Sequence, residues 1–153
     1  MAHIEAIPEP TRSHILHLYC PSFDTHPFVQ GPPLAGRRIA ILSSAAIHSR
    51  AEPPFPFGSA EFRRLPESLA AGDIVMSHVS VNYDRSGFQR DLNVIYPIDR
   101  LRELAADGVI GSVAAAHHSV LGATDPVAMQ ETAAQLVGQL EQDRVDAVLL
   151  VPV

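Results

Sequence analysis

The sequence predicts an α/β fold, with a Rossmann-like, three-layer arrangement of helices around a parallel sheet. Apolar runs rich in β-branched residues occur at 38–43 and 146–152, and helical periodicity marks 97–107 and 126–143. Helix and strand alternate through the second half of the chain, which favours parallel strands. The strand runs are apolar throughout, as in sheets that are covered on both faces.

The composition indicates one globular domain and excludes several classes of protein. The chain has 153 residues, of which 46% are hydrophobic and 18% charged, so a disordered chain is excluded. Its net charge of −6 argues against nucleic-acid binding. We expect no membrane span, because no window approaches 18 apolar residues, and a cytoplasmic location, because the N-terminus lacks a signal pattern. Cys20 is the single cysteine, which excludes an internal disulfide and is expected to be inert.

The chain divides into a proline-rich arm at 1–36 and an α/β domain at 37–153. Proline fixes φ and removes a hydrogen-bond donor, so we expect an irregular arm that wraps the surface, with one helical turn at His14 to Leu18. The arm prolines are Pro8, Pro10, Pro21, Pro27, Pro32 and Pro33. In the domain, residues 38–43 follow Gly36 as a buried strand, and 49–72 are expected to be a loop.

The remaining elements follow in order. Residues 73–77 predict a weakly marked strand, and Pro97 begins a helix whose apolar residues recur at helical spacing up to Gly108, the expected C′ residue. Residues 109–114 predict a strand. Asp125 and Pro126 form an N-cap and N1 pair for a helix that runs to about residue 143. Residues 146–152 then form the most hydrophobic strand of the chain.

That last strand ends at Val153 with no polar tail or covering helix. In open parallel sheets, ligands bind just beyond the carboxyl ends of the strands. Two interpretations remain open on physical grounds: a short final strand, or a domain that is incomplete at its C-terminus.

Polar side chains that suit chemistry follow the predicted strands. The familiar nucleotide, hydrolase and metalloprotease motifs are absent. His117 and His118 follow the predicted strand at 109–114, and a polar stretch after the strand at 73–77 contains Ser77, His78, Asn82, Asp84, Arg90 and Asp91. We expect both sets on one rim of the sheet, where histidine can move protons and a carboxylate can orient it.

Structural interpretations compete with these roles. Asp84 and Arg90 can form a simple ion pair, and Asp91 and Asn93 can cap the backbone before the helix at 97–107. Neighbouring histidines on a strand face opposite ways, so a metal shared by the two is not favoured, and no metal ligand is assigned.

Several stretches together resemble the selenoprotein B family of the glycine, sarcosine, betaine and D-proline reductases, and most of all its short D-proline-reductase-like branch. The resemblance covers about residues 30 to 153, and its most specific part runs from Ser77 to Gly111. The stretches are Gly31-Pro-Pro-Leu, Arg38 to Ser44, Ser77-His78, Tyr83-Asp84, Arg90 to Pro97, Asp99 to Leu104, Gly108 to Gly111 and Asp146 to Val153.

The resemblance implies that a selenocysteine follows the strand at 146–153, with a cysteine three positions later. It therefore favours a chain that stops before its selenocysteine and is inactive alone. A selenol is ionised at neutral pH, and the cysteine resolves a selenenyl sulfide by exchange. In the family this chemistry cleaves a C–N bond reductively, with a pyruvoyl group on a partner subunit and a dithiol as the electron donor. No cofactor is expected in this chain itself.

If the chain is such a subunit, we expect the polar residues to line the rim that faces the selenol, and we assign them roles there. His78 or His118 would donate a proton to the leaving amine, Arg90 would clamp a carboxylate, and Asp84 would orient a partner. The substrate-binding residues would be Ser77, Asn82, Asp91, Asn93 and His117. The sequence does not specify the substrate or whether the chain forms a homo-oligomer. Two alternative functions remain: a non-catalytic Rossmann-like scaffold that docks partner chains, and a histidine-rich metal protein.

Overall fold

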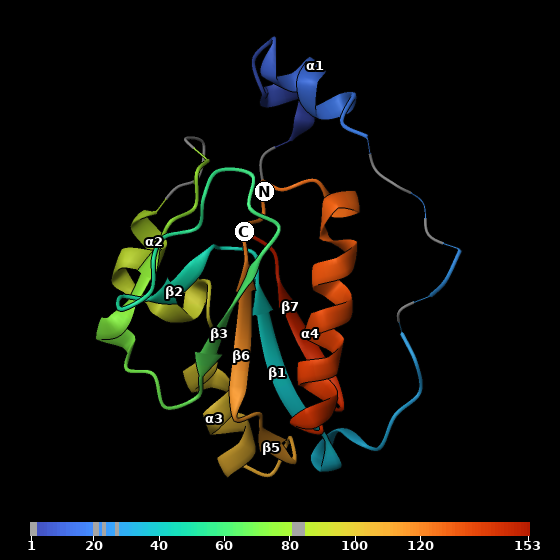
Figure 1. Cartoon of the computed structure of the whole chain (residues 1–153), viewed down its shortest axis with the longest axis vertical. Helices are drawn as coiled ribbons and strands as arrows, with labels where there is room; N and C mark the ends of the chain where they lie inside the picture. Colours follow the sequence, from blue (N-terminus) through green and yellow to red (C-terminus); the bar gives the residue numbers. More distant parts are fainter. Residues whose placement is uncertain (1–2, 20–21, 23, 27, 81–84) are drawn as a thin grey trace.

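The computed structural model describes residues 3–19, 22, 24–26, 28–80 and 85–153. It is an α/β fold in which a curled, mostly parallel sheet lies between helices (Figure 1). The strands are β1 (Arg38–Ser43), β2 (Ile47–Ser49), β3 (Phe62–Pro66), β4 (Ile74–Met76), β5 (Ser112–Val113), β6 (Ala116–Val120) and β7 (Ala147–Val151). The α-helices are α1 (Thr11–Leu16), α2 (Ser86–Arg90), α3 (Ile98–Ala106) and α4 (Gln130–Gln142).

The main sheet has the order β3-β6-β1-β7, and β5 pairs with the amino end of β1. β1 runs parallel to β5, β6 and β7, and its ladder with β7 extends from Ile39 to Ser43. The predicted strands at 38–43 and 146–152 are therefore confirmed as neighbours. The sheet is not wholly parallel, because β3 runs antiparallel to β6.

The expectation of a loop over 49–72 was wrong in part. β3 lies inside this stretch and pairs with the whole of β6. The prolines around β3 favoured the prediction of a loop. Within the strand, however, exposed and buried side chains alternate: that of Arg64 is exposed and that of Leu65 is buried. β4 is confirmed as a strand, but it pairs with β2 in a separate antiparallel ladder.

The placement of His117 and His118 after a strand was also wrong. The predicted strand at 109–114 shortens to β5, and both histidines lie within β6. β1 pairs first with β5 and then with β6, and its backbone pairing with them is interrupted between the two. At this gap the N–H of Ile41 donates to Nδ1 of His117 at 3.0 Å. The buried ring thus accepts a hydrogen bond that a backbone carbonyl would accept in a regular ladder.

Two of the helices begin and end where the sequence predicts. The Asp125 carboxylate accepts a hydrogen bond from the N–H of Val127, and Pro126 begins a 3-10 turn, Pro126–Met129, that leads into α4. α3 follows Pro97, and Gly108 adopts a φ of +69°, the left-handed conformation expected after a helix.

The helices cover the sheet from both faces. Ile98 and Leu101 of α3 share the main hydrophobic core with Ile39 and Ile41 of β1. α4 lies on the opposite face of the sheet (Figure 1). There Gln139 contacts His118. None of the helices in the described residues is both long and apolar enough to cross a bilayer.

Most described residues of the N-terminal arm are exposed, and none of them is buried. Its helix α1 begins three residues earlier than the predicted turn at His14 to Leu18. The other 3-10 turns are Ile4–Ala6, Leu34–Gly36, Ala71–Asp73 and Leu92–Val94.

Candidate functional site

The carboxyl ends of β1 and β7 meet at Ser44. The N–H of Ser44 donates to the carbonyl of Val151 at 3.1 Å, and the N–H of Val153 donates to the Ser44 Oγ at 2.8 Å. Gly122, which follows β6, donates its N–H to the Ser44 carbonyl at 3.0 Å. A Cβ at Gly122 would lie 2.8 Å from that carbonyl oxygen, so only glycine fits this approach. These bonds fix the chain after β7 against the carboxyl edge of the sheet.

Ser77 lies beyond the same end of β1. Its N–H donates to the carbonyl of Ala46 at 3.0 Å, and its Oγ accepts from the N–H of Phe55 at 3.0 Å. Ala46 has a φ of 53° and donates its own N–H to the carbonyl of Val120. The Ser77 hydroxyl therefore joins the loop around Phe55 to the carboxyl side of the sheet.

His78 is buried beside Ser77, on a segment held by Arg85. Its Nδ1 accepts a hydrogen bond from the N–H of Ser80 at 3.1 Å, so the neutral ring carries its proton on Nε2. Burial, and then the nearby Arg85 guanidinium, lower the pKa of His78 below its ordinary value. The Arg85 guanidinium donates to the carbonyls of His78 and Ser80, at 2.7 and 3.2 Å. The ring is thus held in its neutral form, with its proton on Nε2.

Asn82 and Asp84, which the sequence analysis assigned to substrate binding and orientation, lie outside the described residues.

Asp91 and Asn93 form a capping network before α3. The Asp91 carboxylate accepts from the N–H and the side-chain amide of Asn93, each at 2.9 Å, and Asn93 Oδ1 accepts from the N–H of Asp99. The amide of Asn93 lowers the pKa of Asp91. Arg90 is the exposed last residue of α2.

His117 and His118 face opposite sides of the sheet. His117 is fully buried, and its ring meets that of Tyr96 edge to face, with centroids 5.5 Å apart. Burial lowers the pKa of His117 to about 4 and raises that of the Tyr96 hydroxyl. His117 thus lies on the α3 side, away from the rim where the sequence analysis expected it.

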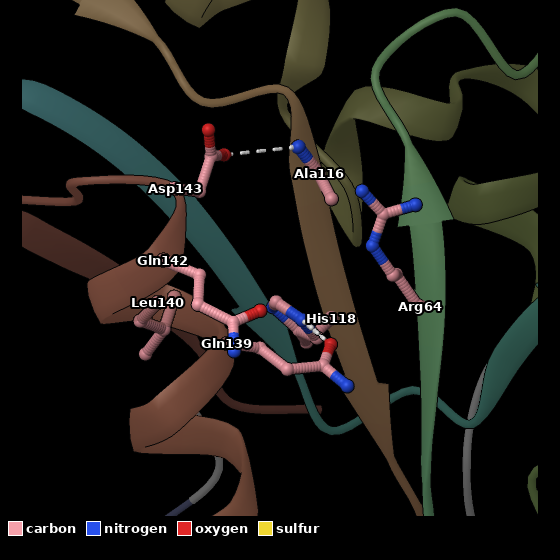
Figure 2. A pocket seen from close by; sticks show the side chains of 7 residues that line it. All are labelled: Arg64, Ala116, His118, Gln139, Leu140, Gln142 and Asp143. Atoms are coloured by element: carbon pink, nitrogen blue, oxygen red, sulfur yellow. Dashed lines mark hydrogen bonds between the residues drawn. The ribbon is translucent and has the colours of Figure 1, made fainter.

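His118 lies on the α4 side, in a cavity between α4, β6 and β3 (Figure 2). Its Nε2 lies 3.1 Å from Oε1 of Gln139, and the ring of Phe62 packs edge-on against it. Burial lowers the pKa of His118 as well. The structure therefore separates His118 from His117 and from the segment that carries His78.

The sequence analysis missed Ser44, Arg64 and Gln139. Ser44 directly follows a predicted strand, and that position alone could have marked it. Arg64 and Gln139 meet only because β3 pairs with β6 and α4 covers it, and no local pattern carries that information. No group of three or more histidine, cysteine, aspartate or glutamate side chains that could hold a metal ion occurs in the part of the chain that the structure describes.

Comparison with known proteins gives matches at the level of sequence. A family model described as glycine/sarcosine/betaine reductase selenoprotein B matches residues 63–153. The chain is 31% identical over 115 residues to the D-proline reductase subunit gamma of Acetoanaerobium sticklandii. The aligned region covers 73% of this chain and 47% of that protein, so the chain spans about half the length of the curated relative that it matches. No solved structure matches.

Proposed function

Because the chain belongs to the glycine/sarcosine/betaine reductase selenoprotein B family, we propose that it forms part of an amino-acid reductase subunit that cleaves a C–N bond. The observation that carries the proposal is the family match over residues 63–153, which covers the elements from β3 to β7 and leaves β1 outside. The similarity to a D-proline reductase subunit supports a cyclic or N-substituted amino acid as the substrate. It also supports assembly with further subunits.

The proposed reaction takes up two electrons and two protons. The C–N bond breaks, the carbon gains a hydrogen and the nitrogen leaves as an amine, while a dithiol donor is oxidised to a disulfide. A pyruvoyl group on a partner subunit would activate the substrate. A selenol in the segment after β7 would supply a nucleophile that is ionised at neutral pH and is regenerated by thiol exchange.

The carboxyl edge of the sheet fits a reacting group placed after β7. Five register pairs join β1 and β7, so β7 is paired with β1 along its whole length, up to its carboxyl end at Val151. The Ser44 hydroxyl then binds the backbone of Val153, two residues beyond the strand. A side chain that follows Val153 would therefore start from a fixed position, and such positioning contributes much of the rate of enzymatic reactions.

His78 is the histidine that we assign to proton donation. It follows Ser77, which is bonded to Ala46 beyond the carboxyl end of β1. Its lowered pKa keeps the resting ring neutral at pH 7, so the ring would first take up a proton at Nδ1, in place of the hydrogen bond from Ser80 N–H, and then pass the Nε2 proton to the leaving amine. His118 is not given this role, because it lines the cavity on the α4 face.

The test uses the full-length gene product, produced with selenocysteine insertion and assembled with its pyruvoyl-bearing partner. With dithiothreitol and D-proline, we expect 5-aminovalerate to form. His78→Gln should lower kcat by about 10²-fold or more, the usual contribution of general acid catalysis. His48→Gln is the matched control, since His48 is also buried and contacts only a backbone carbonyl among its described hydrogen bonds.

Two results would contradict the proposal. An assembled enzyme that reduces none of D-proline, glycine, sarcosine and betaine would remove the reductase function. Equal kcat values for the two histidine variants would remove the role of His78 and leave the reductase function standing. Residues 1–153 alone, which contain no selenocysteine, should give no product.

A further inference from the structure

The cavity between α4, β6 and β3 has features of a ligand site that the proposed reaction does not use. Its volume is about 350 Å³. Its lining residues come from the strands β3 and β6, from α4 and from the residue that follows α4: Arg64, Ala116, His118, Gln139, Leu140, Gln142 and Asp143 (Figure 2). It opens on the face opposite α3, near the amino end of β6, whereas Ser44 lies at the carboxyl edge of the sheet.

The cavity carries an unpaired positive charge. Arg64 is exposed, and no ion pair or hydrogen bond of its guanidinium occurs among the described residues. Its neighbour Arg63, in contrast, pairs with Glu61 at 2.8 Å and lies over the ring of Phe55. Arginine in this state is a ready binding group for an anion.

The one carboxylate in the cavity is already neutralised. Asp143 pairs with the Arg38 guanidinium, and its second oxygen accepts from the N–H groups of Ala115 and Ala116 at 2.7 and 3.3 Å. The Arg64 guanidinium therefore has no competing anion in the wall of the cavity.

His118 adds a buried nitrogen that lacks a partner. The residue is 3% exposed, and Phe62 and Gln139 fix its ring. With Nε2 donating to Gln139, the atom Nδ1 is buried and has no hydrogen-bond partner within the described part of the chain. Leaving a buried polar atom unpaired is costly. In the neutral ring Nδ1 is an acceptor, so an anion can pair with it only when the ring takes up a proton there.

We propose that this cavity binds a small carboxylate, which pairs with the Arg64 guanidinium and accepts a hydrogen bond from Nδ1–H of His118. The Gln139 amide, whose oxygen His118 already uses, offers its NH₂ group as a further donor. A monoanion matches the single unpaired guanidinium at neutral pH. The inference rests on the cavity alone, and it holds whether or not the chain is a reductase subunit.

Binding should take up one proton. Burial, and the charge of Arg64, lower the pKa of His118, so its free ring is neutral at pH 7. The charged groups that face it are Arg64 from β3 and Asp143 from the end of α4, the latter paired with Arg38 of β1. A bound carboxylate offsets the Arg64 charge and favours the imidazolium. Affinity should therefore rise as the pH falls from 8 to 5.5.

The experiment is a titration of the full chain, labelled with ¹⁵N in its histidines, with sodium acetate at fixed ionic strength and with chloride as the replaced ion. The His118 signals are assigned by their loss in His118→Asn. We expect saturable binding and a shift of Nδ1 towards its protonated position. Arg64→Gln should raise the acetate Kd about tenfold or more, the usual effect of losing a charge-assisted hydrogen bond.

Arg100→Gln is the matched control. It removes the same charge from an exposed position on α3, where Arg100 pairs only with Glu103 among its described ion pairs, and should leave the Kd unchanged within about twofold. Gln139→Glu keeps the acceptor for His118 and places an anion in the cavity, so acetate binding should vanish. Equal Kd values for the two arginine variants would overturn the proposal, as would His118 signals that acetate does not move. Binding of phosphate without binding of acetate would overturn the carboxylate assignment.

Discussion

Acidification should destabilise the fold through His117. The ring is fully buried, and its Nδ1 accepts the N–H of Ile41 at 3.0 Å, which requires an unprotonated nitrogen. Burial lowers the pKa of His117 from 6.5 to about 4. A proton on Nδ1 would remove the hydrogen bond and leave a charge inside the core beside Tyr96.

The sign and size of the effect follow from linkage. The folded state favours the neutral ring, so this contribution is complete above pH 6.5 and is lost as the pH falls from 6.5 towards 4. The full lowering corresponds to about 3.4 kcal/mol, because one pKa unit is about 1.4 kcal/mol. Between pH 7 and pH 4.5 the loss is about 2.5 kcal/mol, a large fraction of the stability of a typical domain.

The assay is urea unfolding at several pH values between 7 and 4.5, on the wild-type chain and on His117→Asn. The asparagine Oδ1 occupies nearly the position of the histidine Nδ1, so it keeps an acceptor for Ile41 and does not titrate. The variant starts from a lower free energy of unfolding, since it leaves a small cavity. Its further loss on acidification should be about 2.5 kcal/mol smaller than that of the wild type.

His78 and His118 also have lowered pKa values, and they contribute the same sign in both proteins. The comparison between the two pH dependences therefore isolates His117. Parallel curves for wild type and variant would show that the buried ring does not drive acid unfolding, and would refute this reasoning.

Further predictions concern backbone positions and can be checked by the same unfolding assay at pH 7. Gly122→Ala should destabilise the chain by about 1–3 kcal/mol, because its Cβ would meet the Ser44 carbonyl at 2.8 Å. Gly138→Ala, in open space on α4, should instead stabilise it by up to about 1 kcal/mol; an equal effect at both glycines would contradict the packing described at Ser44. Asp125→Ala should cost about 1 kcal/mol by removing the cap on Val127, and Asp125→Asn should restore most of it; a neutral Asp125→Ala would show that the cap is dispensable.

Local pattern predicted the elements whose signal is local. β1 and β7 are continuous apolar runs, and α4 has both a cap and a clear apolar face. β3 and β6 were missed, because their sequences, Phe-Arg-Arg-Leu-Pro and Ala-His-His-Ser-Val, lack apolar character. They form strands because they pair with each other, because β6 also pairs with β1, and because the ring of His117 satisfies a backbone donor of β1. Such tertiary compensation is invisible in a local window.

The candidate site divides in the same way. The sequence singled out Ser77 and His78, which lie beyond the carboxyl end of β1. It also singled out His118, but it could not show that the side chain points into a cavity with Arg64 and Gln139, since those residues are about 50 and 20 positions away and meet only in the folded chain. The roles of Arg90, Asp91 and Asn93 stay predictions, and the described contacts of the last two are those of a helix cap.

The measurement that tests the proposed function most directly is the nucleotide sequence that follows the codon for Val153. A selenol-dependent reductase subunit predicts a UGA codon, read as selenocysteine, with an in-frame cysteine codon three positions later and an RNA hairpin downstream. A UAA or UAG codon, or a codon for any ordinary amino acid, at that position would contradict the proposed selenol chemistry.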